Sequence, residues 1–294
     1  MVSACSSGGG GSSSSSSTTV SPFTSWGAVQ PNSTVQAGGG SSQFSYAANP
    51  VTGVVTAVGF NGQSTGGAAV NLSYGSGALN LSGVALQSAQ GQFVSIQASA
   101  GDFLGAYGSG PVPVLIYGRS KDGRNEVLGA NAPAYGWNYQ TYGVWVTGNG
   151  VGVGTAGAVS AGSATPGTSI PTSGSATFVG NALGIYTSGL TYATAASMQA
   201  TVNFSSRTIG FSTGGTVASN FNGSGGYNAP GLNLTGTLAY APATTSFSGA
   251  VRSAGGMSGT AAGNFYGPNA NEIGGTYALT GNGGAMGGGF GGKR

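Results

Sequence analysis

Short runs that alternate apolar with small or polar residues recur along this chain, and they restrict its fold more than any other feature. Residues 198–204 alternate cleanly before a Ser-Ser turn, and residues 232–240 repeat the pattern. Side chains two positions apart lie on one face of a β-strand, so each run predicts a half-buried strand. No segment keeps a helical period over about 12 residues. The alternation therefore predicts an all-β protein.

Composition agrees with a folded chain that begins with a flexible segment. Glycine accounts for 61 of 294 residues and charged residues for only 4%, yet aromatic residues make up 10% and recur inside the alternating runs. Disordered chains carry few aromatics, so the glycines are those of a β-protein. A net charge of +3, with no basic cluster, argues against nucleic acid as a partner. There is no run of about 18 apolar residues that would form a transmembrane helix.

Cys5 follows Met1-Val2-Ser3-Ala4, which is similar to the end of a bacterial lipoprotein signal. Residues 6–19 are almost pure Ser, Gly and Thr and predict a flexible tether. Residues 1–34 are therefore expected to be a lipoprotein N-terminus and tether, with Cys5 as the lipidated residue. The alternative is a chance cysteine near the start.

Two β-domains are expected after the tether. Residues 35–150 hold short strand runs and form a smaller β-rich domain, and residues 173–294 hold about eight strands at regular spacing. The second series predicts an antiparallel eight-stranded β-barrel. Residues 151–172 show no alternation and are interpreted as a linker. A transmembrane barrel is the alternative, but it needs longer strands and aromatic girdles.

Residues 119–126 hold five of the eleven formal charges around an Asp122-Gly123 turn signal. They form either a solvated hairpin tip or a polar contact patch for a protein. The aromatic run that follows places Tyr135, Trp137 and Tyr139 on one predicted strand face. That face either packs in the core or forms an exposed strip for a ligand. The candidate ligand contacts are Arg119, Lys121, Arg124, Tyr135, Trp137 and Tyr142.

Catalysis and metal binding are not expected. The chain contains no histidine, the commonest general base and zinc ligand. The four carboxylates at positions 102, 122, 126 and 272 show no close pair. Glu272 is expected to be structural, accepting hydrogen bonds from turn amides or pairing with Arg207 or Arg252. No cofactor is expected; haem remains an option as cargo only, with Met or Tyr as its ligand. The tyrosines considered are Tyr107, Tyr117, Tyr135 and Tyr142.

Three segments resemble the β-barrel domain of the transferrin-binding-protein-like surface lipoproteins of Gram-negative bacteria. They are residues 165–180, residues 263–277 with Gly-Pro-Asn and Glu272, and the ending Phe290-Gly-Gly-Lys-Arg294. Upstream, residues 139–145 resemble the strand that closes the neighbouring "handle" domain of that family, which would be residues 35–150. The resemblance covers about residues 130–294.

The resemblance implies an outer-membrane protein, lipid-anchored through Cys5 and exposed at the cell surface. Members of the family capture an iron-carrier protein, haem, a haemoprotein or another factor. Many pass it to a TonB-dependent outer-membrane receptor. Their binding loops vary, so no ligand residue is carried over. A structural or adhesive surface protein with no uptake role is the alternative, which the richness in Gly, Ser, Thr and Asn also suits.

Overall fold

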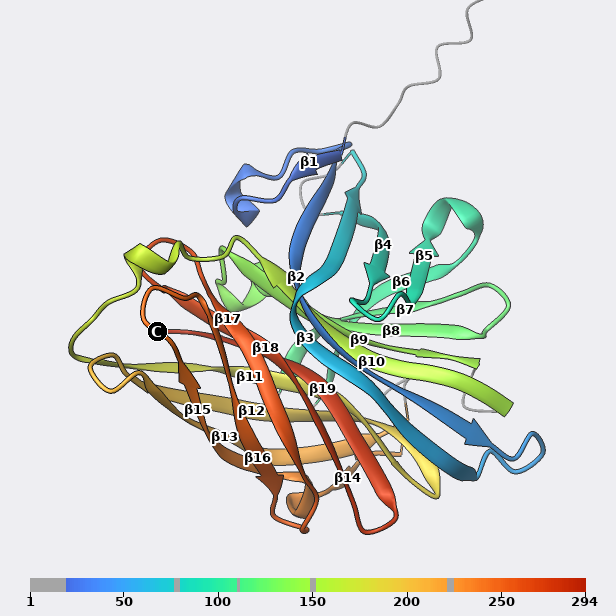
Figure 1. Cartoon of the computed structure of the whole chain (residues 1–294). Coiled ribbons are helices and arrows are strands. Elements are labelled where there is room, and N and C mark those ends of the chain that lie inside the picture. Colours follow the sequence, from blue (N-terminus) through green and yellow to red (C-terminus); the bar gives the residue numbers. More distant parts are fainter. Residues whose placement is uncertain (1–19, 77–79, 110–111, 149–151, 221–224) are drawn as a thin grey trace, which may run out of the picture.

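The computed structural model describes residues 20–76, 80–109, 112–148, 152–220 and 225–294. Cys5 and residues 6–19 lie outside the described residues. Within them, strands form two large antiparallel sheets, which Figure 1 shows side by side. No helix among these residues is long and apolar enough to cross a bilayer. The expected all-β class is confirmed.

The first sheet holds ten strands in the order β5-β4-β3-β2-β10-β9-β8-β7-β6, with β1 parallel to β2. Its strands are β1 (Val20–Pro22), β2 (Thr34–Ala48), β3 (Val55–Tyr74), β4 (Leu81–Gln87), β5 (Phe93–Gln97), β6 (Phe103–Ser109), β7 (Val112–Arg119), β8 (Asn125–Ala130), β9 (Gln140–Thr147) and β10 (Gly152–Gly162). The sheet curls so that its end strands β5 and β6 come into contact, and a side chain at Gly118 of β7 would meet Ile96 of β5 at 3.0 Å. It is a nearly closed barrel with a concave inner face.

The second sheet closes on itself. β12 pairs with both β11 and β13, so eight strands form a complete barrel and the two-residue β14 is added at its edge. The strands are β11 (Ser175–Ser188), β12 (Leu190–Asn203), β13 (Thr208–Ser219), β14 (Tyr227–Asn228), β15 (Leu234–Tyr240), β16 (Ser246–Ser253), β17 (Ser258–Tyr266), β18 (Glu272–Gly281) and β19 (Gly284–Lys293). The predicted eight-stranded antiparallel barrel is confirmed.

The second barrel is apolar inside and polar outside. Along β12, Met198, Ala200 and Val202 are buried, while the residues between them are exposed. Phe265 and Phe290 fill the interior, with ring contacts to other inward-facing aromatics. The interior of this barrel is therefore a packed apolar core. Its longest strands have 14 residues, more than the short strands expected.

Short 3₁₀ turns connect several strands. They are η1 (Trp26–Ala28), η2 (Ala98–Ala100), η3 (Ala132–Tyr135), η5 (Gly167–Ser169) and η6 (Pro230–Leu232).

Two sequence expectations are corrected here. The expected linker 151–172 contains β10, which pairs with β2 and β9 in the middle of the first sheet. A side chain at Gly157 would meet the Trp145 ring at 2.4 Å, so this strand carries small residues instead of an alternating pattern. The expected tether is also ordered from Val20, since β1 joins the sheet and Trp26 is buried.

The two barrels share an extensive contact. The outer face of β11, β18 and β19 packs against the outer face of β2, β9 and β10. Gly287 and Gly289 of β19 leave room for the rings of Phe44 and Tyr142. From β3, Gln63 donates to the carbonyl of Thr276 at 2.8 Å. The handle and the barrel therefore form one packed unit.

Candidate functional site

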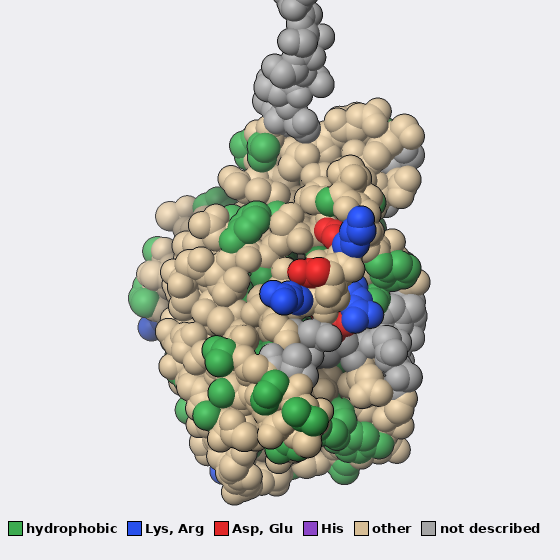
Figure 2. All heavy atoms as spheres, turned by 90° about the vertical axis from the view of Figure 1, so that its right-hand side faces the viewer, with side chains coloured by type: hydrophobic (Ala, Val, Ile, Leu, Met, Phe, Trp, Pro, Cys, Tyr) green, Lys and Arg blue, Asp and Glu red, His purple; other side chains and the backbone are tan. Residues whose placement is uncertain are grey.

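The hairpin formed by β7 and β8 carries five of the eleven formal charges of this protein. Asp102, just before β6, adds a sixth, and Figure 2 shows these charges grouped on one face. We call this group the charged hairpin; it comprises Asp102, Arg119, Lys121, Asp122, Arg124 and Glu126. The three basic and three acidic groups balance, so the patch is polar without being strongly positive.

Asp122 builds the turn of the charged hairpin. Its Oδ1 accepts hydrogen bonds from the Ser120 hydroxyl at 2.6 Å and from the backbone amide of Arg124 at 3.0 Å. Gly123 has a φ of 70°, the left-handed conformation that such a tight turn favours in glycine. The Ser120 hydroxyl, followed by the Arg124 amide, holds the pKa of Asp122 below its ordinary value. The predicted turn is confirmed, and Asp122 is a structural acceptor.

Asp102 fixes the neighbouring loop to this hairpin. Its two oxygens accept backbone amides from Gln97 and from Lys121, each at 2.8 Å. The structure therefore brings three of the four carboxylates to one end of the handle. From the sequence alone we expected no close pair of carboxylates, because Asp102 is far from Asp122 and Glu126 along the chain. All three hold backbone or neighbouring side-chain groups.

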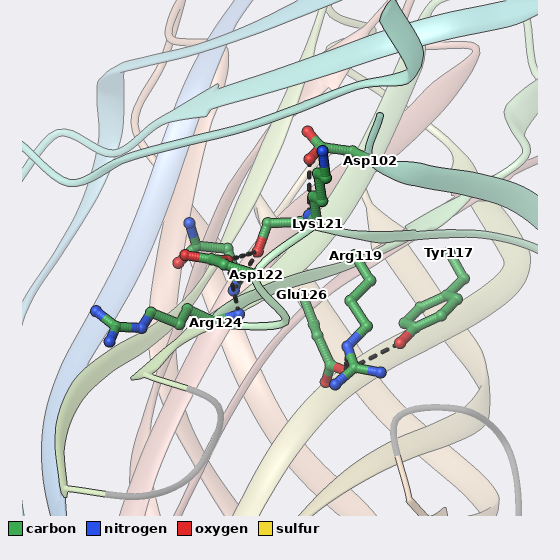
Figure 3. Close-up of polar contacts among 9 residues, drawn as sticks. Asp102, Tyr117, Arg119, Lys121, Asp122, Arg124 and Glu126 are labelled. Atoms are coloured by element: carbon green, nitrogen blue, oxygen red, sulfur yellow. Dashed lines mark hydrogen bonds and ion pairs between the residues drawn. The ribbon is translucent and has the colours of Figure 1, made fainter. Parts of the chain in front are cut away.

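Glu126 anchors Arg119 across the β7–β8 ladder, as Figure 3 shows. Its Oε1 lies 3.4 Å from the Arg119 Nε and accepts the Tyr117 hydroxyl at 2.9 Å. Within the described residues this is the only ion pair closer than 4 Å. Burial raises the pKa of Glu126, and the Tyr117 hydrogen bond and the Arg119 charge partly offset that rise.

The outward side of the charged hairpin combines cations with an aromatic ring. Lys121 and Arg124 are exposed, and Arg124 points away from the hairpin in Figure 3. Phe103 of β6 is 59% exposed, and its ring centroid lies 5.8 Å from that of Tyr117. A shallow hollow of about 360 Å³ lies between Phe103 and the turn. Aromatic and arginine side chains are favoured in protein contacts, so this surface fits the contact-patch interpretation.

Phe103 was missed by the sequence interpretation. No turn signal marks its position in the sequence. Phe103 lies near the cations because it is the cross-strand partner of Arg119.

The aromatic candidates lie elsewhere. Tyr135 ends the 3₁₀ turn η3, and Gly136 follows with a φ of 65°, so the predicted strand across residues 135–139 is wrong. Pro133 at the start of η3 favours the turn over an extended strand. Trp137 and Tyr142 are each only 1% exposed, which contradicts an exposed aromatic strip. Trp137 stacks between Tyr135 and Tyr142, at centroid distances of 5.1 and 6.0 Å. These rings pack the core instead of joining Arg119, Lys121 and Arg124.

Two of the four tyrosines considered for haem do not fit that role. The Tyr142 hydroxyl donates to Asn181 of the second barrel, and burial raises its pKa well above the ordinary value. The Tyr117 hydroxyl is held by Glu126. The side chain of Tyr107 lies outside the described part of the structure, so its proposed role stays a prediction. Nor do the described residues contain a group of three acidic, His or Cys side chains placed for a metal.

Glu272 joins the two barrels. Its two carboxylate oxygens accept the amides of Asn138 at 2.5 Å and Tyr139 at 3.0 Å. The prediction that it accepts turn amides is therefore confirmed, whereas pairing with Arg207 or Arg252 is wrong. Its cross-strand partner is Lys293. Burial raises its pKa, and the amides of Asn138, Tyr139 and Gln140, followed by the Lys293 charge, partly offset that rise.

Residues 170–294 match the family model for the C-lobe and N-lobe beta barrels of Tf-binding protein B. The second barrel is thus similar to the barrels of TbpB. The match begins at Ile170, just before β11, and runs through β19. It therefore includes Glu272 and excludes the charged hairpin. No curated protein matches the sequence.

Solved structures of whole TbpB proteins are similar to this chain at low identity. A TbpB mutant from Haemophilus parasuis Hp5 gives a TM-score of 0.43 at 12% identity, over 76% of this chain and 53% of that one. Isotype 1 TbpB from serogroup B Neisseria meningitidis gives 0.41 at 13% identity, over 90% and 77%. A surface lipoprotein gives 0.34 at 13% identity, over 66% and 98%. The chain thus spans about half the length of the Haemophilus protein.

Proposed function

We propose that this protein is a bacterial surface lipoprotein that captures an iron-carrier protein of the transferrin type and presents it to a TonB-dependent outer-membrane receptor. Cys5 carries the lipid anchor in the outer membrane, and the charged hairpin is the contact surface. The observation that supports this most directly is the TbpB-type barrel, because its family model describes barrels of a transferrin-binding protein. It acts as a binding protein and not as an enzyme.

The charged hairpin supports a protein ligand over haem. It presents Lys121 and Arg124 beside the exposed Phe103 of β6, on a turn fixed by Asp102 and Asp122. A rigid aromatic and cationic surface suits a folded partner, because little side-chain or loop entropy is lost on binding. The hydroxyls of Tyr117 and Tyr142, by contrast, are already hydrogen-bonded inside the protein.

The test is direct binding of iron-loaded and iron-free transferrin to an immobilised Cys5→Ser protein. We expect Phe103→Ser and Lys121→Glu each to weaken binding by about ten-fold or more, as expected for central contact residues. Arg252→Glu, on an exposed site of the second barrel, is the matched control and keeps wild-type affinity. Binding should change little with salt, because the patch carries three charges of each sign.

Several results would overturn the proposal. These are equal binding by all variants, a steep salt dependence, or no transferrin binding together with a Soret shift on adding haem. Recovery of only glycans or of further copies of the chain would favour the adhesive alternative. Fractionation of cells that express the wild type or Cys5→Ser tests the anchor, and an unchanged membrane fraction would contradict it.

A further inference from the structure

The inner face of the first sheet encloses an apolar cavity of about 250 Å³. Protein interiors are packed so closely that voids rarely exceed a water molecule, and an engineered cavity of about 150 Å³ already binds benzene. The lining comes from opposite sides of the curled sheet. Its main side chains are Leu72, Val84, Leu86, Leu104, Ile116 and Val127.

The cavity has room where two neighbouring strands, β8 and β9, each carry a glycine. Gly129 of β8 and Gly143 of β9 are direct cross-strand partners, and Gly129 also pairs with Ile116 of β7. A side chain built at Gly129 would approach no atom closer than 3.6 Å. Gly129 has no left-handed φ that would require glycine. The space at Gly129 therefore exists because the residue there is glycine, although the backbone would accept a larger residue.

One end of the cavity reaches solvent. Asn80 is exposed and Asn131 half-exposed, and both stand where β3, β4, β8 and β9 meet at the same end of the sheet. Trp26 lies at this end, and its indole N–H donates to the Gln140 carbonyl at 3.1 Å. The described lining contains no Lys, Arg, Asp or Glu. The chemistry is thus an aliphatic interior with neutral amide groups at the mouth.

We propose that this cavity binds a neutral aliphatic chain, with the chain among the leucine and valine side chains and a hydroxyl or similar uncharged polar end at Asn80 and Asn131. A charged end is disfavoured, since moving a carboxylate to a site without a cation leaves its lost hydration uncompensated. This binding site is separate from the charged hairpin and does not depend on the proposed function.

The test uses the full chain, with 1-decanol and decanoate as the probes at pH 8. Trp26 provides the signal, because an occupant of the cavity lies against its indole. We expect saturable 1-decanol binding that shifts tryptophan emission and raises Tm, and decanoate binding weaker by about ten-fold or more. Gly129→Val fills the cavity and should abolish the 1-decanol response without lowering Tm. Gly210→Val, in an open position of β13, is the matched control and binds as the wild type does.

Equal binding of the two probes, or unchanged 1-decanol binding by Gly129→Val, would overturn the assignment. If Gly129→Val lowers Tm, Leu86→Trp serves as the second cavity-filling variant, with the same loss of binding expected. A Trp26→Phe protein distinguishes the signal from the other indoles: it should bind 1-decanol by the Tm measure with little change in emission.

Discussion

At the scale of single residues, Glu272 shows how one carboxylate can join two domains. Its oxygens accept two consecutive backbone amides of the handle. Because its pKa in the folded protein is raised above the ordinary value of 4.5, protonation favours folding. The contribution of its titration is fully present below that ordinary pKa and is lost as pH rises through the folded pKa. The titration of Asp122 affects stability in the opposite direction, because its pKa in the folded protein is lowered. Its contribution is present above the ordinary pKa and is lost as pH falls through the folded pKa.

Replacing Glu272 with Ala should lower the free energy of unfolding by about 1–3 kcal/mol, because two amide donors lose their acceptor. The difference between wild type and Glu272→Ala should narrow as pH rises from about 4 towards 7. Asp122→Ala should show a difference that instead narrows as pH falls below the ordinary pKa of 3.8. Urea unfolding of the wild type and of each variant, at pH values from below 3.8 up to 7, measures both stability differences. Parallel pH profiles for the two variants would contradict the assignment.

At the scale of elements, β19 is restricted on both faces. Gly287, Gly289 and Gly291 face the handle, where side chains would meet Phe44, Tyr142 and Gln140. Gly288 faces inward, where a side chain would meet the Tyr277 hydroxyl at 2.3 Å. The glycines of this strand thus allow a sheet-to-sheet contact outside and aromatic packing inside.

Gly289→Val should destabilise the protein by about 1–3 kcal/mol through overpacking. The new Cβ would lie 2.7 Å from the Tyr142 ring, in a buried contact between two sheets. Gly210→Val on β13 is the control, since its nearest atom would be 3.9 Å away. Chemical denaturation compares them. Equal stability of the two variants would show that the Tyr142 contact is loose.

The sequence predicts strands well where one face is buried and poorly where both are. The alternation at residues 198–204 yields β12 directly. By contrast, both faces of β10 are buried. Ala156, Ala158 and Val159 are therefore all fully buried, and the sequence shows no alternation. The run at 135–139 alternates without forming a strand, because Pro133 and Gly136 favour a turn.

At the scale of the whole molecule, the two barrels meet in an apolar interface, while the interior of the second barrel has an apolar cluster of its own. Leu183 and Ile185 of β11 belong to the same apolar cluster as Val144 of the handle. The Asp122 turn and the three nearby cations could be predicted from sequence spacing. Phe103 could not be predicted, because strand register and not spacing brings it to the patch. The acceptor role of Glu272 was predictable, but its partners on the other domain were not.

The apolar interface between the two barrels predicts one cooperative unfolding transition. All three tryptophans, Trp26, Trp137 and Trp145, lie in the handle, so tryptophan emission reports on that domain alone. Far-UV circular dichroism reports on both barrels. The two signals should give coincident urea curves. Separate midpoints would show that the handle and barrel unfold independently.

The position of β19 also sets an order for biosynthesis. The ladders of the handle are complete once residue 162 has been made, but the second barrel, including Gly287 and Gly289, still has to pack against Phe44 and Tyr142. The same strand seals the barrel through its pairing with β11. A nascent chain therefore exposes an apolar sheet face through most of its synthesis, which is when chaperone binding or aggregation competes with folding. The barrel can therefore close only when the last glycine-rich strand arrives.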